Sequence, residues 1–176
     1  MTILVCPLAQ VARQIERHRP ERIVSLLDPG DRFPETGYGA RHLMLEMHDV
    51  EVSLYGERAP HMEHARELIA FVRAWPGEAP LLIHCRAGVS RSTASAYVAA
   101  CARNPDADAA EIARALRAAS PTARPNPALV MLADEALQRR GRMIDAYIAT
   151  FHDLGLVEVM EAEPFSLASR FNEARR

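Results

Sequence analysis

The sequence predicts a single α/β domain in which a central, mostly parallel sheet is flanked by helices. In the first half of the chain, apolar runs of strand length, such as 22–28 and 80–85, alternate with segments whose apolar residues have helical spacing. In the second half, helical patterns follow one another from residue 91 to residue 152. Strands that are separated by helices favour parallel, right-handed connections. A length of 176 residues, of which 49% are apolar, suits one domain with a buried core.

Turn-forming residues bound the strands predicted in the first half. The run 22–28 is rich in β-branched residues and ends at Pro29-Gly30, which is the clearest strand-then-turn signal there. The run 80–85 is continuously apolar, as expected for a strand that is buried on both faces. In chain order, the first half is predicted to contain strand 3–6, helix 8–18, strand 22–28, strand 42–47, helix 60–74 and strand 80–85.

The second half is predicted to be helical. Residues 91–103 carry small and apolar side chains, which suits a helix buried against the sheet. An amphipathic helix at 106–119 is followed by helices at 127–140, where Pro127 occupies a first-turn position, and at 141–152. The pattern weakens from residue 153. We therefore predict a domain over residues 1–152 and a C-terminal tail of uncertain structure over residues 153–176.

Composition excludes several classes of protein. The net charge of −2 gives no reason to expect nucleic-acid binding. The chain contains no run of about 18 apolar residues, so no membrane span is expected. The N-terminus lacks the basic region and long apolar run of a signal peptide. Three cysteines do not make a disulfide framework, so a reducing, cytoplasmic location is expected. The oligomeric state stays open.

The segment 84–92, HCRAGVSRS, carries the predicted chemistry because it leaves a buried strand and enters a helix. A loop over a helix N-terminus directs backbone N–H groups inward, where they and the helix dipole bind a phosphate dianion. The same setting favours a thiolate, which we expect at Cys85. Arg91 can hold two phosphate oxygens with its planar fork. Gly88 supplies backbone freedom, and the Ser92 hydroxyl could donate to the Cys85 sulfur.

A His-Cys pair, five residues including a glycine, and an Arg-Ser pair make this segment resemble the signature loop of the protein tyrosine phosphatase superfamily. The resemblance implies that Cys85 attacks phosphorus and forms a cysteinyl-phosphate, which water then hydrolyses with help from Ser92. It also implies that the loop amides and the Arg91 guanidinium stabilise the transferred phosphoryl group. The phosphate-binding residues are then Arg86, Ala87, Gly88, Val89, Ser90 and Arg91. This chemistry needs no metal and no cofactor.

The resemblance also requires a general acid, which the family takes from an aspartate roughly thirty to forty residues before the cysteine. Asp49 lies 36 residues before Cys85 and just after the predicted strand 42–47, where a strand-end loop can reach over the phosphate site. Asp28 and Asp31 lie 57 and 54 residues before the cysteine, too far for this pattern. Asp49 is therefore the predicted acid, and its plainer alternative is a loop or N-cap residue.

Four further residues receive supporting or structural roles. His84 is expected to orient the backbone near the cysteine. Asn126 resembles the asparagine that supports the signature loop in small dual-specificity members, although a helix N-cap is an equal alternative. Cys6 and Cys101 are expected to be buried apolar residues, with a redox pair to Cys85 as the alternative.

The size of the chain and the absence of a Trp-Pro-Asp triplet favour the compact, dual-specificity-like branch of the superfamily. The expected substrates are phosphotyrosine proteins, with phosphoserine and phosphothreonine proteins as further possibilities. A phosphoinositide or inositol-phosphate phosphatase is the second enzyme alternative, although Arg86 is the only extra basic residue in the loop. A catalytically inactive phospho-binding module is the alternative from a different class, but a binder has no need of the acid.

Overall fold

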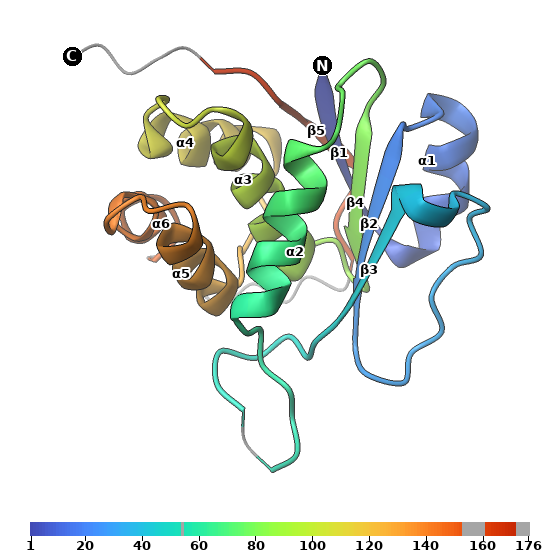
Figure 1. The fold of residues 1–176 in the computed structure, drawn as a ribbon, viewed down its shortest axis with the longest axis horizontal. Helices are drawn as coiled ribbons and strands as arrows, with labels where there is room; N and C mark the ends of the chain where they lie inside the picture. The colour runs from blue at the N-terminus through green and yellow to red at the C-terminus, as the bar shows by residue number, and fades with distance from the viewer. Residues whose placement is uncertain (54, 153–160, 172–176) are drawn as a thin grey trace.

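The computed structural model describes residues 1–53, 55–152 and 161–171, which form a five-stranded sheet with helices on both faces (Figure 1). The strands are β1 (Thr2–Pro7), β2 (Arg22–Leu27), β3 (His42–Glu46), β4 (Leu81–Cys85) and β5 (Phe165–Ala168). The helices are α1 (Val11–His18), α2 (Met62–Arg73), α3 (Arg91–Arg103), α4 (Ala109–Ala119), α5 (Pro127–Ala136) and α6 (Arg142–Phe151). Two 3-10 turns, η1 (Leu8–Gln10) and η2 (Gly39–Arg41), precede α1 and β3.

The strand order is β3-β2-β4-β1-β5, and four of the five strands are parallel. β4 pairs with both β1 and β2, and all five of its residues are buried. β5 pairs with β1 in the antiparallel sense and closes one edge of the sheet. Because the parallel strands point the same way, their carboxyl ends meet at one edge, where the loops after β1, β2, β3 and β4 gather.

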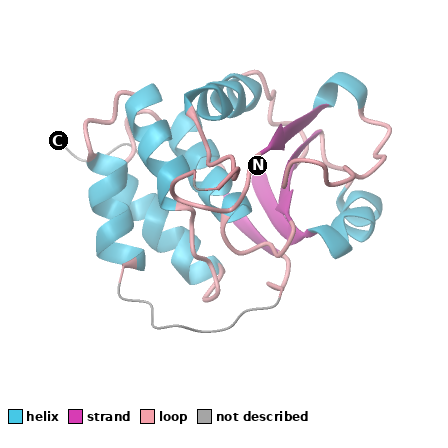
Figure 2. Cartoon of the chain, turned by 90° about the horizontal axis from the view of Figure 1, so that it is seen from below, coloured by secondary structure: helices cyan, strands magenta, loops and turns pink. Residues whose placement is uncertain are grey.

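The two faces of the sheet are covered unequally (Figures 1 and 2). Helices α2 to α6 lie on one side, and their apolar residues form the main core with side chains such as Val24, Leu26 and Ile83. The other face carries α1, which closes a smaller cluster around Val11, Ile23 and Leu82. Within the described residues, none of the helices is long and apolar enough to span a bilayer.

The predicted fold class, a single α/β domain with a mostly parallel sheet and the loop 84–92 between a buried strand and a helix, is confirmed. Part of the segment predicted as a tail of uncertain structure forms the strand β5. Phe165 and Leu167 turn toward the main core, and β5 pairs with β1 over four residues. So short a strand carries too little alternation to be recognised in the sequence. The remainder of the predicted tail lies outside the described residues.

The helix predicted at 127–140 ends at Ala136 instead. Gln138 and Arg140 have positive φ values of 55° and 57°, which a helix does not accommodate. The Arg139 side chain donates to the carbonyl oxygens of Cys101, Asn104 and Ala107, and thereby satisfies groups at and beyond the end of α3. The helix therefore ends before Arg139, whose buried side chain forms hydrogen bonds to the carbonyl groups at and beyond the end of α3.

Candidate active site

The loop between β4 and α3 is held by backbone contacts from three other parts of the chain. The carbonyl oxygen of Arg86 accepts from the N–H of Leu8 at 3.0 Å, and that of Ala87 accepts from Ala162 at 2.8 Å. The carbonyl oxygens of Val89 and Ser90 accept from Arg124 at 2.9 Å and from Asn126 at 3.4 Å. Because these carbonyls are bonded outward, the surrounding fold fixes the orientation of the loop peptides.

Gly88 is required at its position for two independent reasons. Its φ of 76° lies in the left-handed region, which other residues adopt at a cost. A Cβ atom there would also lie 2.8 Å from the backbone nitrogen of Pro7 and 3.0 Å from the carbonyl carbon of Cys6. The end of β1 therefore packs directly against the loop, and this position has no room for a side chain.

The Cys85 sulfur lies at the base of the loop and has two polar neighbours. The Gly88 N–H donates to it at 3.3 Å, and the Ser92 Oγ lies 3.1 Å from it. Cys85 and Ser92 are 1% and 0% exposed. An N–H group and a hydroxyl directed at a sulfur stabilise its anionic form, and α3 begins at Arg91 with its positive dipole end toward this point.

The Arg91 side chain folds back over the site and is 3% exposed. Its Nη1 donates to Asp28 Oδ1 at 2.7 Å and to the Met47 carbonyl oxygen at 2.6 Å. Asp28 follows β2 and Met47 follows β3, so two strand ends hold the guanidinium in place. Among the described residues, no hydrogen bond uses Nε or Nη2, the pair of atoms that could hold two oxygens of one phosphoryl group.

Asp49 comes from the loop after β3 and reaches the same site. Its Oδ1 accepts from Ser90 Oγ at 2.6 Å and from Asn126 Nδ2 at 3.0 Å, and its Oδ2 lies 3.8 Å from Arg91 Nε.

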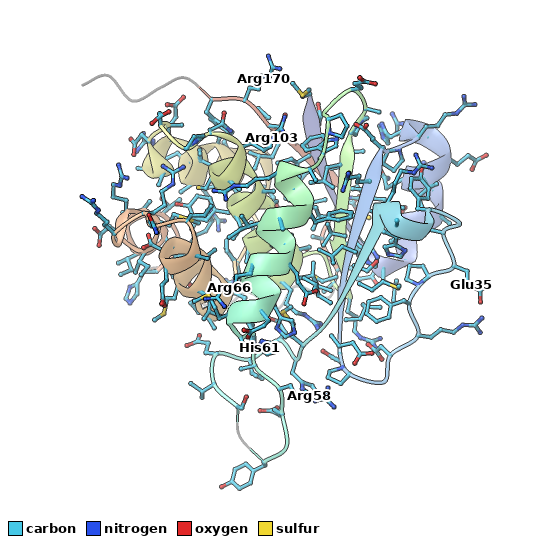
Figure 3. The ribbon with its side chains drawn as sticks, in the orientation of Figure 1. Glu35, Arg58, His61, Arg66, Arg103 and Arg170 are labelled. Carbon is cyan, nitrogen blue, oxygen red and sulfur yellow. The ribbon has the colours of Figure 1, made fainter. Side chains whose placement is uncertain are left out.

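His48 pairs with Arg58 through two hydrogen bonds of 2.8 Å, one backbone to backbone and one onto the ring, and so closes the loop that follows. Figure 3 labels Arg58 near His61 at the start of α2.

The Asn126 side chain occupies the N-cap position of α5, which the sequence offered as one alternative, and also contacts the loop after β3. Its Oδ1 accepts from the Leu129 N–H at 3.1 Å and caps α5, while its Nδ2 donates to Asp49 and to the Val50 carbonyl oxygen. The side chain therefore connects the start of α5 to the loop that carries Asp49. Its support of the loop after β4 comes through its backbone N–H, which donates to Ser90.

The remaining basic residue of the loop, Arg86, is neutralised locally. Its Nη2 donates to both carboxylate oxygens of Asp31, at 2.8 and 2.7 Å. The Arg86 side chain is 58% exposed and that of Asp31 is 26% exposed. This ion pair reduces the positive charge with which the loop could bind a second phosphate group.

His84 is fully buried, and its side chain is the first in a series of polar side chains that contact one another behind the cysteine. Its Nε2 lies 2.5 Å from Ser25 Oγ, which lies 2.7 Å from His42 Nε2, and His42 Nδ1 lies 3.0 Å from Thr36 Oγ1. Burial lowers the pKa of His84 to about 4, partly opposed by a backbone interaction with Cys85, and the neighbouring His42 lowers it further. Both rings are therefore held as neutral hydrogen-bonding groups at pH 7.

We expect the stability of the protein to fall as the pH is lowered from about 6.5 to about 4, partly because of His84. In that window the unfolded chain binds a proton at this ring that the folded chain does not, so low pH favours unfolding. A shift of this size corresponds to roughly 3 kcal/mol of unfolding free energy when complete. Denaturant unfolding at several pH values should give a shallower dependence for His84→Gln than for the wild type.

Burial also lowers the pKa of His64 to about 4, so part of the pH dependence of the unfolding free energy should remain in His84→Gln. An identical pH dependence in His84→Gln and wild type would contradict the assigned cause.

The other two cysteines are free and buried. Cys6 packs in the cluster on the α1 face, whereas Cys85 belongs to the main core on the opposite face. Burial raises the pKa of both Cys6 and Cys101 to about 12, which suits the expected apolar role. Among the residues that the structure describes, no group of His, Cys, Asp and Glu side chains is arranged to hold a metal ion.

The structure thus brings together Cys85, Arg91, Ser92, Asp49 and the loop between them, which the sequence singled out. It adds Asp28 beside Arg91, and Ser25 and His42 behind His84, which sequence reasoning missed. Asp28 was considered only as an acid and set aside by its spacing. Its place at the carboxyl end of a strand next to β4 was the signal that could have found it, because such ends gather at one edge.

Comparison with known proteins supports this architecture. No protein-family model and no curated protein matches the sequence. Among solved structures, DUSP15 superposes with a TM-score of 0.59 at 19% identity, over 86% of this chain and 91% of that one. Human DUSP28 gives 0.57 at 19% identity, over 75% and 86%. PTPMT1 in complex with PI(5)P gives 0.56 at 13% identity, over 78% and 91%.

At these identities the likeness establishes the fold. The chain shares the fold of these structures and of a mouse putative dual specificity phosphatase, which gives a TM-score of 0.56 at 17% identity.

Proposed function

We propose that this protein is a phosphoric monoester hydrolase that works through a cysteinyl-phosphate and acts on phosphotyrosine proteins, with phosphoserine and phosphothreonine proteins as further substrates. One observation carries the proposal. The buried Cys85 sulfur receives the Gly88 N–H and lies beside the Ser92 hydroxyl, at the start of a helix whose first residue, Arg91, folds over the same site. A cysteine that only fills space in a core does not require an N–H donor, a hydroxyl and an arginine beside its sulfur.

The reaction has two displacements. The Cys85 thiolate attacks phosphorus, an S–P bond forms, and the P–O bond to the leaving group breaks. The equatorial oxygens are stabilised by the loop amides and by Nε and Nη2 of Arg91. Water then attacks the phosphorus, the S–P bond breaks, and inorganic phosphate leaves. The Ser92 hydroxyl, 3.1 Å from the sulfur, donates to the departing thiolate.

Asp49 is the proposed general acid. It gives its proton to the leaving oxygen in the first step, and as a carboxylate it takes a proton from the attacking water in the second. Its contacts with Ser90, Asn126 and Arg91 support this role, because they hold the carboxyl over the loop between β4 and α3. Asp28 accepts a hydrogen bond from Nη1 of Arg91, and it is assigned to positioning the guanidinium.

A protein substrate is favoured over a phosphoinositide by the ion pair of Arg86 with Asp31. A headgroup with several phosphates needs cations beyond the reacting phosphate, and Arg86 is the one basic residue in the loop besides Arg91. PTPMT1, with the same fold, was crystallised with PI(5)P, so this alternative has to be measured. Release of inorganic phosphate from phosphotyrosine, phosphoserine and phosphothreonine peptides and from phosphoinositides should be greatest for the peptides.

A higher kcat/KM for phosphoinositides would transfer the assignment to that substrate class. The absence of turnover with every phosphoester in the set would favour the phospho-binding module. This one measurement can therefore contradict the proposal in two different ways.

The Asp49→Asn variant should be slower by about a hundredfold or more on an alkyl phosphate, whose leaving group needs a proton. On an aryl phosphate with a strongly acidic phenol the loss should be much smaller, because that phenolate departs unprotonated. The fall of the rate at high pH should also disappear. Steady-state kinetics with both substrates over a pH series measure this. Asp31→Asn is the matched control, and an equal loss on both substrates would place the acid elsewhere.

A further inference from the structure

A polar groove of about 510 Å³ lies on the face of the sheet that carries α1, apart from the site described above. The helix covers Ile23 and Leu82 of β2 and β4, and the groove opens beside it over β1 and β5. Leu4 and Ser166 are register partners, so their side chains share this face. The side chains that line it include Arg13, Gln14, Arg17, Thr2, Ser166 and Glu163.

The wall formed by α1 is lined by polar groups whose hydrogen-bonding capacity is unused. Gln14 is only 7% exposed, yet among the described residues its side chain makes no hydrogen bond. The Gln14 side chain lines the groove, so its amide can bond a ligand that lies there. Arg13 and Arg17 are exposed, make no ion pair with any described residue, and lie four residues apart, so they share one side of the helix.

The charge of the groove selects an anionic ligand. Two guanidinium groups stand on one wall and a single carboxylate, Glu163, on the other. Guanidinium groups pair most strongly with carboxylates and phosphates. Gln14 offers both a donor and an acceptor, which suits the backbone of an extended peptide.

Both walls of the groove start at the loop between β4 and α3. Leu8, two residues before the groove residue Gln10, donates its N–H to Arg86, and Ala162, next to Glu163, donates to Ala87. The two acceptors are neighbours in the loop, so the near end of the groove lies close to the outer, carbonyl side of this loop. The far end is at His18, about 12 Å further along α1.

We propose that this groove binds an acidic segment of the phosphorylated protein substrate, with Arg13 and Arg17 pairing with its carboxylates and Gln14 bonding its backbone. This inference rests on the proposed function, whose substrate class it narrows. A membrane lipid is disfavoured as the source of the anion, since none of the exposed large apolar side chains among the described residues lines the groove.

The test compares three substrates with the full-length wild type: a phosphotyrosine peptide with flanking glutamates, the same peptide with glutamines, and a small aryl phosphate. We expect kcat/KM at low salt to be about tenfold higher for the acidic peptide, through KM, because two exposed charge pairs contribute modestly. The Arg13→Gln/Arg17→Gln variant should lose this preference and hydrolyse the aryl phosphate at the wild-type rate. Arg73→Gln/Arg140→Gln, which removes two exposed charges elsewhere, should keep the preference.

Absence of the preference in the wild type, or its persistence in Arg13→Gln/Arg17→Gln, would overturn the inference while leaving the phosphatase assignment intact. Calorimetric titration with the unphosphorylated acidic peptide separates the two ideas. If no phosphoester is hydrolysed, binding to the wild type that is lost in Arg13→Gln/Arg17→Gln still supports the groove, and no binding rejects it. Vesicles containing anionic lipid are the last arm, and binding to them in place of the peptide would also reject it.

Discussion

Replacing Cys85 by serine should reduce the hydrolysis of an aryl phosphate by a factor on the order of 10⁴ to 10⁶, as removal of a covalent nucleophile does in other enzymes. A serine hydroxyl at this place remains protonated, because the Gly88 N–H and the helix dipole that stabilise a thiolate are too weak for an alkoxide. Single-turnover experiments should also show no phosphoenzyme.

Binding of vanadate or inorganic phosphate to Cys85→Ser should stay close to that of the wild type, because the loop amides and Arg91 remain. Cys101→Ser is the matched control, since it removes a buried thiol from the middle of the core and should keep its turnover number. If Cys85→Ser retains more than a few per cent of activity, the nucleophile is another residue.

Replacing Arg91 by lysine should be nearly as damaging as replacing it by alanine. Loss of one group that stabilises the developing charge costs about 3–4 kcal/mol, or a hundredfold to a thousandfold in kcat. An ammonium has three N–H groups and cannot donate to Asp28, to the Met47 carbonyl oxygen and to two phosphoryl oxygens at once. The guanidinium bonds Asp28 and Met47 through Nη1, which leaves Nε and Nη2 available for the two oxygens. Steady-state kinetics of both variants with one aryl phosphate measure this.

The control for the arginine is Arg86→Lys, in the same loop. Arg86 is exposed and paired with Asp31, so its change should cost less than about fivefold. A mild effect of Arg91→Lys, comparable to that of Arg86→Lys, would show that only the positive charge at position 91 matters.

Much of the fold could be predicted from the sequence because its signals are local. The apolar run 80–85, the Pro29-Gly30 turn and the small residues of 91–103 each depend on a few neighbouring positions, and each gave the element that the structure contains. β5 escaped prediction because its four residues form a strand only where β1 offers an unpaired edge. The early end of α5 was not predicted because it depends on hydrogen bonds from Arg139 to carbonyl groups of α3 and of the turn after it, which are distant in the sequence.

The sequence by itself determined which residues form the loop of the candidate site, since Cys85, Gly88, Arg91 and Ser92 stand in one segment whose spacing sets their order around it. The tertiary structure decided what holds that segment in shape. The loop carbonyls accept hydrogen bonds from three segments remote in sequence, and Gly88 is needed because β1 passes within 2.8 Å of where a Cβ would lie. The partners of Arg91 and Asp49 come likewise from other strand and helix ends. Contacts of this kind depend on how the strands are ordered in the sheet, and that order is not encoded in any one stretch of the chain.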